Sequence, residues 1–402
     1  MRLNWKQKEA LKKKYDVDRI WSFSMINSFH NCPWEYKMKY IDHEKVNTDN
    51  VYTIFGTECH DTIQGYYEGK LTYDDMKKEW ESFVDKWAAD PASYHFDNDK
   101  IKAGYLNNIS HYFEHTDVIK DADVKNELPV LIVLTDDNDK RFVFVGYVDS
   151  RFKTKDGKRI LVDYKSSSKS GFSKSKLPEK SMQLMLYAMG FHQQNNLDYD
   201  DIECKFDMMK YCTVHFLQEN GKWKTSIQER SKWVEKMEKK LQTKLKKLGY
   251  DTVDSTLMIQ EAIVQNNLEN MPQKIKEEFY ITNYFININV NTNSVNEVAS
   301  QVIDRCHEIL DFENIEDLES YLEIHYPYDP DNYYCNKLCA YHSTNKFKEE
   351  NAILGELEPE QDLDALLGDN NLSVDNESKN SIDAEKKKEY SNQVDIINQL
   401  LG

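Results

Sequence analysis

Two aspartates and a lysine stand where two strand-like stretches of the sequence would bring them together. Asp149 lies within the first stretch, and Asp163 and Lys165 end the second. Because side chains alternate along a strand, Asp163 and Lys165 point to the same face. Burying two carboxylates and an ammonium is costly without a compensating partner. A divalent cation bound by both carboxylates, with the lysine beside it, would offset that cost.

The elements that must position these groups form a hairpin. Residues 141–153 and 159–165 are rich in β-branched and aromatic residues, and Asp156-Gly157 between them favours a tight turn. The alternative interpretation is a surface hairpin with an exposed Asp–Lys ion pair, since such pairs are common and contribute little to stability. The other motifs of the chain shift the balance toward a functional site.

These motifs are short and polar, and each alone is a weak signal. Gln183 and Tyr187 lie four residues apart within 177–196, a stretch with helical spacing, so they share one helix face. In chain order the motifs are Ser24 to Cys32-Pro33, Gly56-x-x-x-His60, Glu127, Gly146-x-x-Asp149, Asp163-x-Lys165, Gln183-x-x-x-Tyr187 and a cysteine group that begins at Cys335.

Taken together and in this order, the motifs resemble those of the PD-(D/E)xK nuclease superfamily, in its RecB-like branch. That branch includes phage exonucleases, the nuclease domains of recombination helicase–nucleases and CRISPR-adaptation nucleases. The resemblance covers most of residues 20–345. It implies an α/β fold, with a restriction-endonuclease-like core whose mixed central β-sheet is flanked by helices. An N-terminal helical segment would precede this core, and C-terminal helices would close around it.

The resemblance implies a cation site made of oxygen and nitrogen ligands. Asp149, Asp163 and the backbone carbonyl of Tyr164 would bind Mg²⁺ or Mn²⁺, which prefer oxygen ligands. His60 would reach the same ion, and its nitrogen favours Mn²⁺ somewhat. Judged by spacing alone, His60 is more simply an ordinary core or surface histidine.

The resemblance also implies roles for further side chains. Lys165 would orient or deprotonate the attacking water and stabilise charge that grows on the phosphate. Glu127 would contact a metal-bound water or a second ion. Gln183 and Tyr187 would face the site and contact nucleic acid or position Lys165. The alternatives are an exposed strand residue for Glu127 and a polar stripe on an amphipathic helix for the other two.

The cysteines depart from the family pattern. Many relatives hold a [4Fe–4S] cluster with one N-terminal cysteine and three C-terminal ones spaced C-x2-C-x5-C. Cys32 matches the first, but Cys335 and Cys339 are one residue too far apart, and Asn345 occupies the last position. Three interpretations stay open: a cluster completed by His342 or another ligand, a Zn²⁺ site of Cys32, Cys335, Cys339 and His342, or loss of the metal. We expect the two cysteine regions to lie close together.

Composition indicates a folded protein with an acidic C-terminal part. The 402 residues are 40% apolar, and the seven cysteines form no CxxC pair, so a disulfide framework is not expected. No apolar run approaches the ~18 residues of a membrane span, and the charged start is unlike a secretory signal. We therefore expect a cytoplasmic protein, in the host cytoplasm if it is phage-encoded.

The net charge of −18 argues mildly against a nucleic-acid partner. However, residues 349–402 carry 14 acidic residues against four lysines, which leaves about −8 on the rest of the chain. Bound cations and a locally basic lining can offset a charge of that size. An acidic nuclease is therefore consistent with the composition.

We expect three segments along the chain. Residues 1–120 form a mostly helical N-terminal segment that carries Cys32 and His60, and residues 121–345 form the nuclease core with the Cys335 region. Residues 346–402 form an acidic, disordered tail, in which 363–368 and 394–402 are either partner-induced helices or chance apolar clusters. The expected strands of the core are 124–135, 141–153, 159–165 and 204–217.

The expected function is metal-dependent hydrolysis of DNA by an exonuclease in recombination, repair or DNA degradation. The partners would be DNA and, through the tail, a helicase or a recombination or replication protein, with no membrane. The alternative is a nuclease-fold subunit that binds DNA or scaffolds a complex without cleavage; the joint presence of both acids and the lysine argues against it. The Lys-rich helix expected at 229–248 would line a DNA path together with Trp21, Phe23, Tyr36 and Tyr40. The alternative is that the lysine face of this helix is merely solvated.

Overall fold

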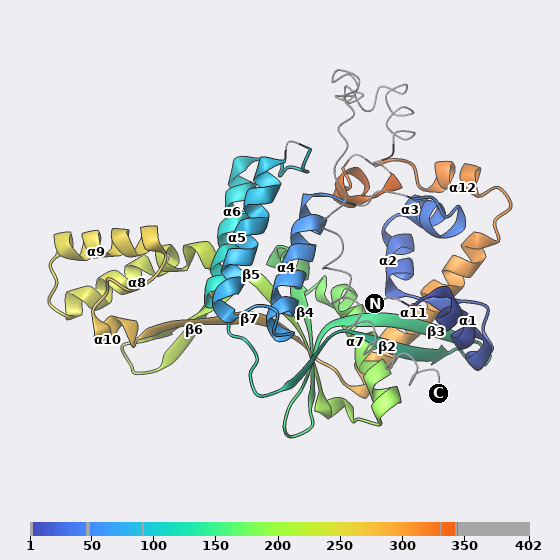
Figure 1. The fold of residues 1–402 in the computed structure, drawn as a ribbon, viewed down its shortest axis with the longest axis horizontal. Coiled ribbons are helices and arrows are strands. Elements are labelled where there is room, and N and C mark those ends of the chain that lie inside the picture. The colour runs from blue at the N-terminus through green and yellow to red at the C-terminus, as the bar shows by residue number, and fades with distance from the viewer. Residues whose placement is uncertain (1–2, 46–48, 91, 330, 342–343, 345–402) are drawn as a thin grey trace, which may run out of the picture.

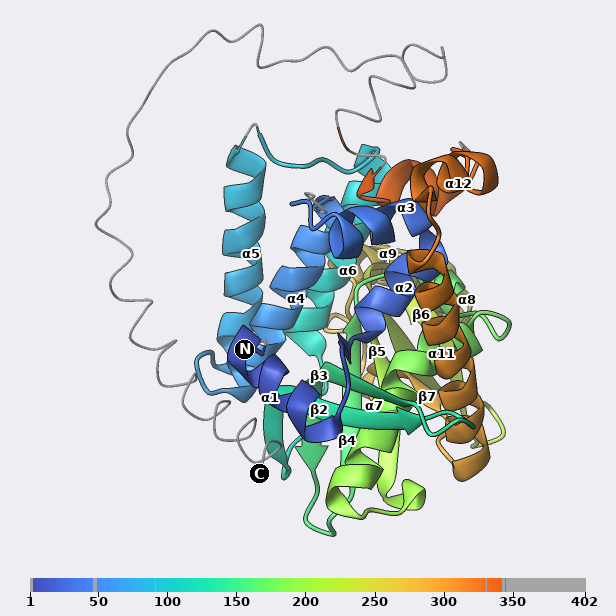
Figure 2. The same ribbon diagram turned by 90° about the vertical axis from the view of Figure 1, so that its right-hand side faces the viewer.

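The computed structural model of the chain describes residues 3–341 and 344, apart from 46–48, 91 and 330. A seven-stranded mixed sheet runs through the molecule, and helices cover both of its faces (Figures 1 and 2). The mixed α/β architecture predicted from the sequence is thereby confirmed. The segments 363–368 and 394–402 lie outside the described residues.

The sheet divides into two arms at the end of its central strand. Strand β4 pairs with β3 on one side, antiparallel, and with β5 on the other side, parallel. Beyond the end of β4, β3 pairs with β1 and β2 in one arm, and β5 pairs with β6 and β7 in the other arm. The strands are β1 (Ile20–Trp21), β2 (Asp123–Thr135), β3 (Arg141–Lys153), β4 (Arg159–Lys165), β5 (Ile202–Leu217), β6 (Trp223–Glu229) and β7 (Phe279–Ile288).

The helices begin at polar caps that the sequence supplies. Asn50 and Asn291 each form a capping box at the start of α4 and α11, and Pro178 occupies the first turn of α7. The helices are α1 (Trp5–Tyr15), α2 (Phe23–Asn31), α3 (Pro33–Tyr36), α4 (Val51–Tyr67), α5 (Tyr73–Ala89), α6 (Asp99–His115), α7 (Leu177–Asn195), α8 (Trp233–Lys247), α9 (Thr252–Gln265), α10 (Gln273–Lys276), α11 (Thr292–Glu313) and α12 (Leu318–His325).

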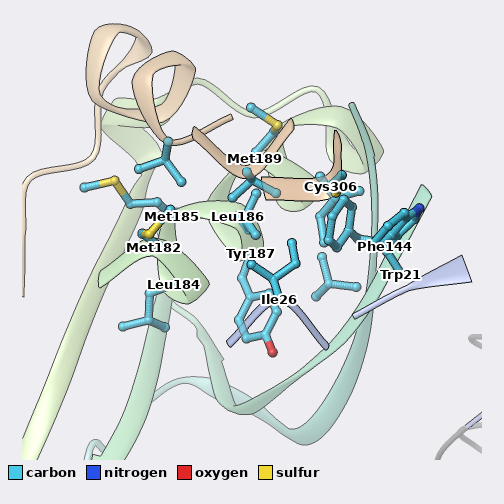
Figure 3. Close-up of a cluster of buried hydrophobic side chains, with 14 of the residues drawn as sticks. Trp21, Ile26, Phe144, Met182, Leu184, Met185, Leu186, Tyr187, Met189 and Cys306 are labelled. Carbon is cyan, nitrogen blue, oxygen red and sulfur yellow. The ribbon is translucent and has the colours of Figure 1, made fainter. Parts of the chain in front are cut away.

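Separate hydrophobic clusters attach these helices to the two faces of the sheet. The largest cluster joins one face to α2, α3, α7 and α11, and Figure 3 shows its centre, where Leu186 and Met189 of α7 lie near Phe144 and Cys306. A second cluster joins the opposite face to α4, α5 and α6. A third lies between α8, α9, α10 and the β5–β7 arm. Helix α1 packs separately on β2 and β3 through Leu11.

Two sequence predictions about local structure and exposure are wrong. The helix expected at 229–248 begins at Trp233, because residues 223–229 form β6 and pair along β5. Tyr36 cannot stack on DNA bases, because its side chain is 0% exposed, and only 4% of Trp21 is exposed. Both rings pack in the largest cluster, and their apolar surface is the physical reason for that burial.

None of the helices in the described part of the chain is long and apolar enough to cross a membrane.

Candidate active site

The hairpin of β3 and β4 and the helices α4 and α7 meet at one small cavity. Its volume is about 190 Å³, which leaves room for an ion and several waters. Asp149 reaches it from β3, Asp163 and Lys165 from β4, and His60 from α4. The cavity therefore lies where the two arms of the sheet part. Its full lining is His60, Val148, Asp149, Asp163, Lys165, Gln183, Leu184 and Tyr187.

His60 connects α4 to both strands of the hairpin. Its Nε2 lies 2.9 Å from the backbone carbonyl oxygen of Tyr164, and its Nδ1 lies 3.4 Å from Asp149 Oδ2. The backbone N–H of Tyr164 donates a hydrogen bond to the same Asp149 oxygen at 3.2 Å. The imidazole, the carbonyl and the carboxylate, for which the resemblance implies a common site, therefore lie close together.

Lys165 pairs with the second acid. Its Nζ lies 2.6 Å from Asp163 Oδ1 and 5.8 Å from the centre of the Phe206 ring. Asp163 Oδ1 is buried, and the Lys165 ammonium is the charged group that meets it there. A divalent cation would add to this stabilisation of the buried carboxylate.

The charges of this cavity influence one another strongly. Burial, and then the Asp163 charge, raise the pKa of Asp149 to about 7, although His60 and Lys165 oppose that rise. Burial lowers the pKa of the Lys165 ammonium, but the Asp163 and Asp149 carboxylates outweigh burial and hold that pKa above its usual range. Because the Asp163 charge disfavours ionised Asp149, a cation bound between the two carboxylates would stabilise the site.

Glu127 lies beside Asp149 through an unusual backbone conformation. The β2–β3 ladder pairs Asn126 with Ser150 and Leu128 with Val148, but it skips the pair between them, Glu127 and Asp149. Glu127 has φ +46°, in the left-handed region that side chains other than glycine rarely adopt. Its charge contributes to the raised pKa of Asp149, and both residues line a neighbouring cleft. Strained backbone at a strand centre is typical of functional sites.

Gln183 and Tyr187 form a hydrogen-bonded pair on α7. Gln183 Nε2 donates to the Tyr187 hydroxyl at 2.8 Å, and both side chains line the cavity. The Tyr187 ring lies against Gly146 of β3: a Cβ at that glycine would fall 2.2 Å from Tyr187 Cε1. Gly146 is therefore required for the close approach of the ring, which explains the glycine three residues before Asp149.

We expect Gly146→Ala to displace Tyr187 and disturb the cavity. The methyl group would overlap the ring, and overpacking of this kind costs about 1–3 kcal/mol of folding stability. Urea unfolding measures this loss, and a nuclease assay measures the accompanying loss of activity. Gly104→Ala is the matched control, because a Cβ at that helical glycine has no atom within 4 Å. Unchanged stability of Gly146→Ala would show that the ring is not held there.

A larger cleft of about 690 Å³ adjoins the cavity and shares Asp149, Gln183 and Tyr187 with it. Phe23 and Tyr40, both half-buried, line it together with Trp21, and their role in a DNA path stays a prediction. The sequence analysis did not predict the basic residues of this cleft. One available signal was Arg19, which directly precedes β1 and the serine that caps α2. The basic residues are Lys8, Arg19 and His43, and Arg19 also donates two hydrogen bonds to Glu313.

The donor groups around the small cavity suit a hard divalent cation. Two carboxylates, a backbone carbonyl and an imidazole are ligands that Mg²⁺ or Mn²⁺ accepts. Among the described residues, no three His, Cys, Asp or Glu side chains already stand at coordinating positions. Lys165 lies against Asp163 Oδ1 and His60 against Asp149 Oδ2 instead.

The two cysteine regions lie together, as expected. The sulfur atoms of Cys32 and Cys339 are 2.7 Å apart as buried free thiols, and the Trp34 ring stacks on Tyr341. Cys335 is half-buried, and the described residues form no three-ligand group here. His342 and Asn345 lie outside the described residues.

The mixed sheet flanked by helices, with two acids and a lysine where its arms part, is a restriction-endonuclease-like fold. A family model of the PD-(D/E)XK nuclease superfamily matches residues 20–262, more than half of the chain. The chain belongs to this superfamily. A comparison with curated proteins finds no match.

Proposed function

We propose that the protein is a metal-dependent deoxyribonuclease, and that the small cavity is its active site. The observation that carries the proposal is the convergence of Asp149, Asp163, Lys165 and His60, from three separate elements, on one cavity. Membership of a nuclease superfamily supports hydrolysis of nucleic acid. Mg²⁺ or Mn²⁺ held by Asp149, Asp163 and the Tyr164 carbonyl, with His60, would polarise the scissile phosphate and its attacking water.

The chain's own side chains would do the remaining work. Lys165 places an ammonium beside Asp163, where it would stabilise charge that develops on the phosphate. Gln183 and Tyr187 would contact the nucleic acid or position Lys165 from α7. Glu127, next to Asp149, would accept a hydrogen bond from water. The adjoining cleft, with its basic and aromatic lining, would receive the strand being cut.

An exonuclease of the RecB-like branch is the specific form that we propose. His60 on α4 and the Gln183–Tyr187 pair on α7 line the cavity and support this form of the proposal. The biological setting would be recombination, repair or DNA degradation, with a helicase or a replication protein as partner of the acidic residues 346–402.

The direct test incubates the full chain with end-labelled linear DNA and with covalently closed circular DNA, in Mg²⁺, Mn²⁺ or EDTA. We expect shortening of the linear DNA in either metal, intact circles, and no reaction in EDTA. Nicked or linearised circles would show an endonuclease instead. Intact linear and circular DNA under both metals would overturn the proposal and favour the alternative, a DNA-binding or scaffolding subunit without cleavage activity.

A further inference from the structure

The β5–β6–β7 arm of the sheet has one open face. Helices α8, α9 and α10 lie on one side of this arm, as Figure 1 shows, and cover it through the third hydrophobic cluster. On β5, Cys212, Val214 and Phe216 point into that cluster, so the alternating residues between them point to the other side. No described helix shares a hydrophobic cluster with the outer half of that other side.

The open face carries a row of aromatic rings. The ladder places His215 opposite Tyr280 on β7 and Leu217 opposite Trp223 on β6, all on this face. The His215 and Tyr280 rings stack, with 4.3 Å between centres and 6° between planes, and Trp223 meets Tyr280 edge to face. Trp223 and Tyr280 are each 48% exposed, which is high for rings of their size.

The face runs toward the candidate active site. Tyr211 lies on it two residues before Thr213, and its hydroxyl accepts a hydrogen bond from the backbone N–H of Lys169, four residues after Lys165. Tyr211 also belongs to the large cluster that contains α7, whose side of the sheet carries the cavity. The aromatic row and the cavity therefore share one side of the sheet, joined by the loop that follows β4.

Between the row and the cavity lies a basic hollow of about 650 Å³. Lys169, Lys232 and Lys236 line it, against a single acidic residue, Glu229. Tyr211 and Tyr284 also line it, and Lys169 Nζ lies 5.7 Å from the centre of the Tyr211 ring. A local excess of positive charge in a chain of net charge −18 attracts a polyanion to this position.

We propose that this open face binds single-stranded DNA, with bases stacked on the exposed rings of Trp223 and Tyr280 and phosphates beside the three lysines. The inference rests on the proposed nuclease function and specifies its substrate. Exposed aromatic rings along a basic sheet surface are how proteins hold single strands without sequence preference. In a duplex the bases are already stacked on one another, so these rings gain contact only with an unpaired strand.

The test measures affinity for a labelled single-stranded oligonucleotide, and for the duplex of the same sequence, by fluorescence anisotropy in EDTA. Loss of one stacked base is worth ~1–3 kcal/mol, so Trp223→Ala and Tyr280→Ala should each weaken single-strand binding at least about fivefold. Duplex binding should change far less. Trp5→Ala is the matched control, because Trp5 is 70% exposed on α1, away from the arm, and it should bind as the wild type does.

Other outcomes separate this inference from the proposed function. If the chain cleaves DNA but both arm variants bind single strands normally, the inference fails alone. If the chain cleaves nothing and the arm variants still lose single-strand affinity, the binding face stands and the nuclease proposal fails. A second copy of the chain is the other candidate to cover this face, and sedimentation tests it. If the wild type is a dimer that Trp223→Ala converts to a monomer, with single-strand affinity unchanged, the face is a contact between copies and the inference is overturned.

Discussion

Lys165→Ala is expected to lower the rate of DNA cleavage by about 10²–10³-fold. Losses of this size follow removal of one preorganised group that stabilises developing charge in a site shielded from water. Lys165 is such a group, because the Asp163 and Asp149 carboxylates hold its pKa above the usual range and so keep it an ammonium in the free protein. Single-turnover cleavage of linear DNA in saturating Mn²⁺ measures the effect.

The control for this variant is Lys155→Ala. Lys155 lies on the turn of the same hairpin, 81% exposed, and pairs only with the exposed Asp121. Its removal should leave cleavage unchanged, since exposed pairs contribute little. Circular dichroism and urea unfolding of both variants separate a lost catalytic group from a lost fold. A folded Lys165→Ala protein that cleaves at the wild-type rate would exclude Lys165 from the chemistry.

The hairpin that carries the acids was predictable from local sequence alone. Asp156-Gly157 demanded a turn, and Gly157 has φ +94° with its N–H donating to Thr154 O. The alternation along 159–165 then fixed the faces of Asp163 and Lys165. Residue spacing is enough to predict a turn or a strand face, because both depend on residues only a few positions apart in the sequence. The approach of His60, from far earlier in the chain, came from the resemblance and not from its own spacing.

Features set by tertiary contacts were not predictable in this way. Strand β6 is polar and largely exposed, so its only strong determinant is the ladder along β5. Trp21 and Tyr36 were recognisable as aromatic but not as buried, since burial depends on where their cluster closes. The left-handed backbone of Glu127 gives no sequence signal either. The ladder omits the pair of Glu127 with Asp149, a break that no residue pattern of the sequence indicates.

A buried polar cluster around Asp207, on the face of the sheet that α6 covers, was also not predictable from the sequence. Asp207 of β5 accepts hydrogen bonds from the Tyr112 hydroxyl at 2.8 Å and from Asn283 Nδ2 at 3.1 Å. Arg230 is fully buried over the Tyr112 ring and donates to Asn283 Oδ1, while Asp207 Oδ1 has no hydrogen-bond partner within the described part of the chain. Asp117 contributes a like charge that disfavours ionised Asp207.

This group should make folding stability depend on pH in a recognisable direction. Burial raises the pKa of Asp207 to about 6, against the opposing hydrogen bonds and Arg230. The folded state therefore binds this proton more tightly than the unfolded state, so stability is lost as pH rises from about 4 to about 6. Asp207→Asn removes the titrating group. The unfolding free energy of the wild type minus that of Asp207→Asn should fall by roughly 3 kcal/mol between pH 4 and 7.

Urea unfolding at several pH values gives this difference directly, and taking the difference cancels the titration of every other carboxylate. Asp200→Asn, at an exposed aspartate, is the control and should give a flat difference across the same range. A flat difference for Asp207→Asn would mean that Arg230 and the two hydrogen bonds fully offset burial. A rising difference would mean that they exceed it, so that ionised Asp207 stabilises the junction of α6, β5 and β7.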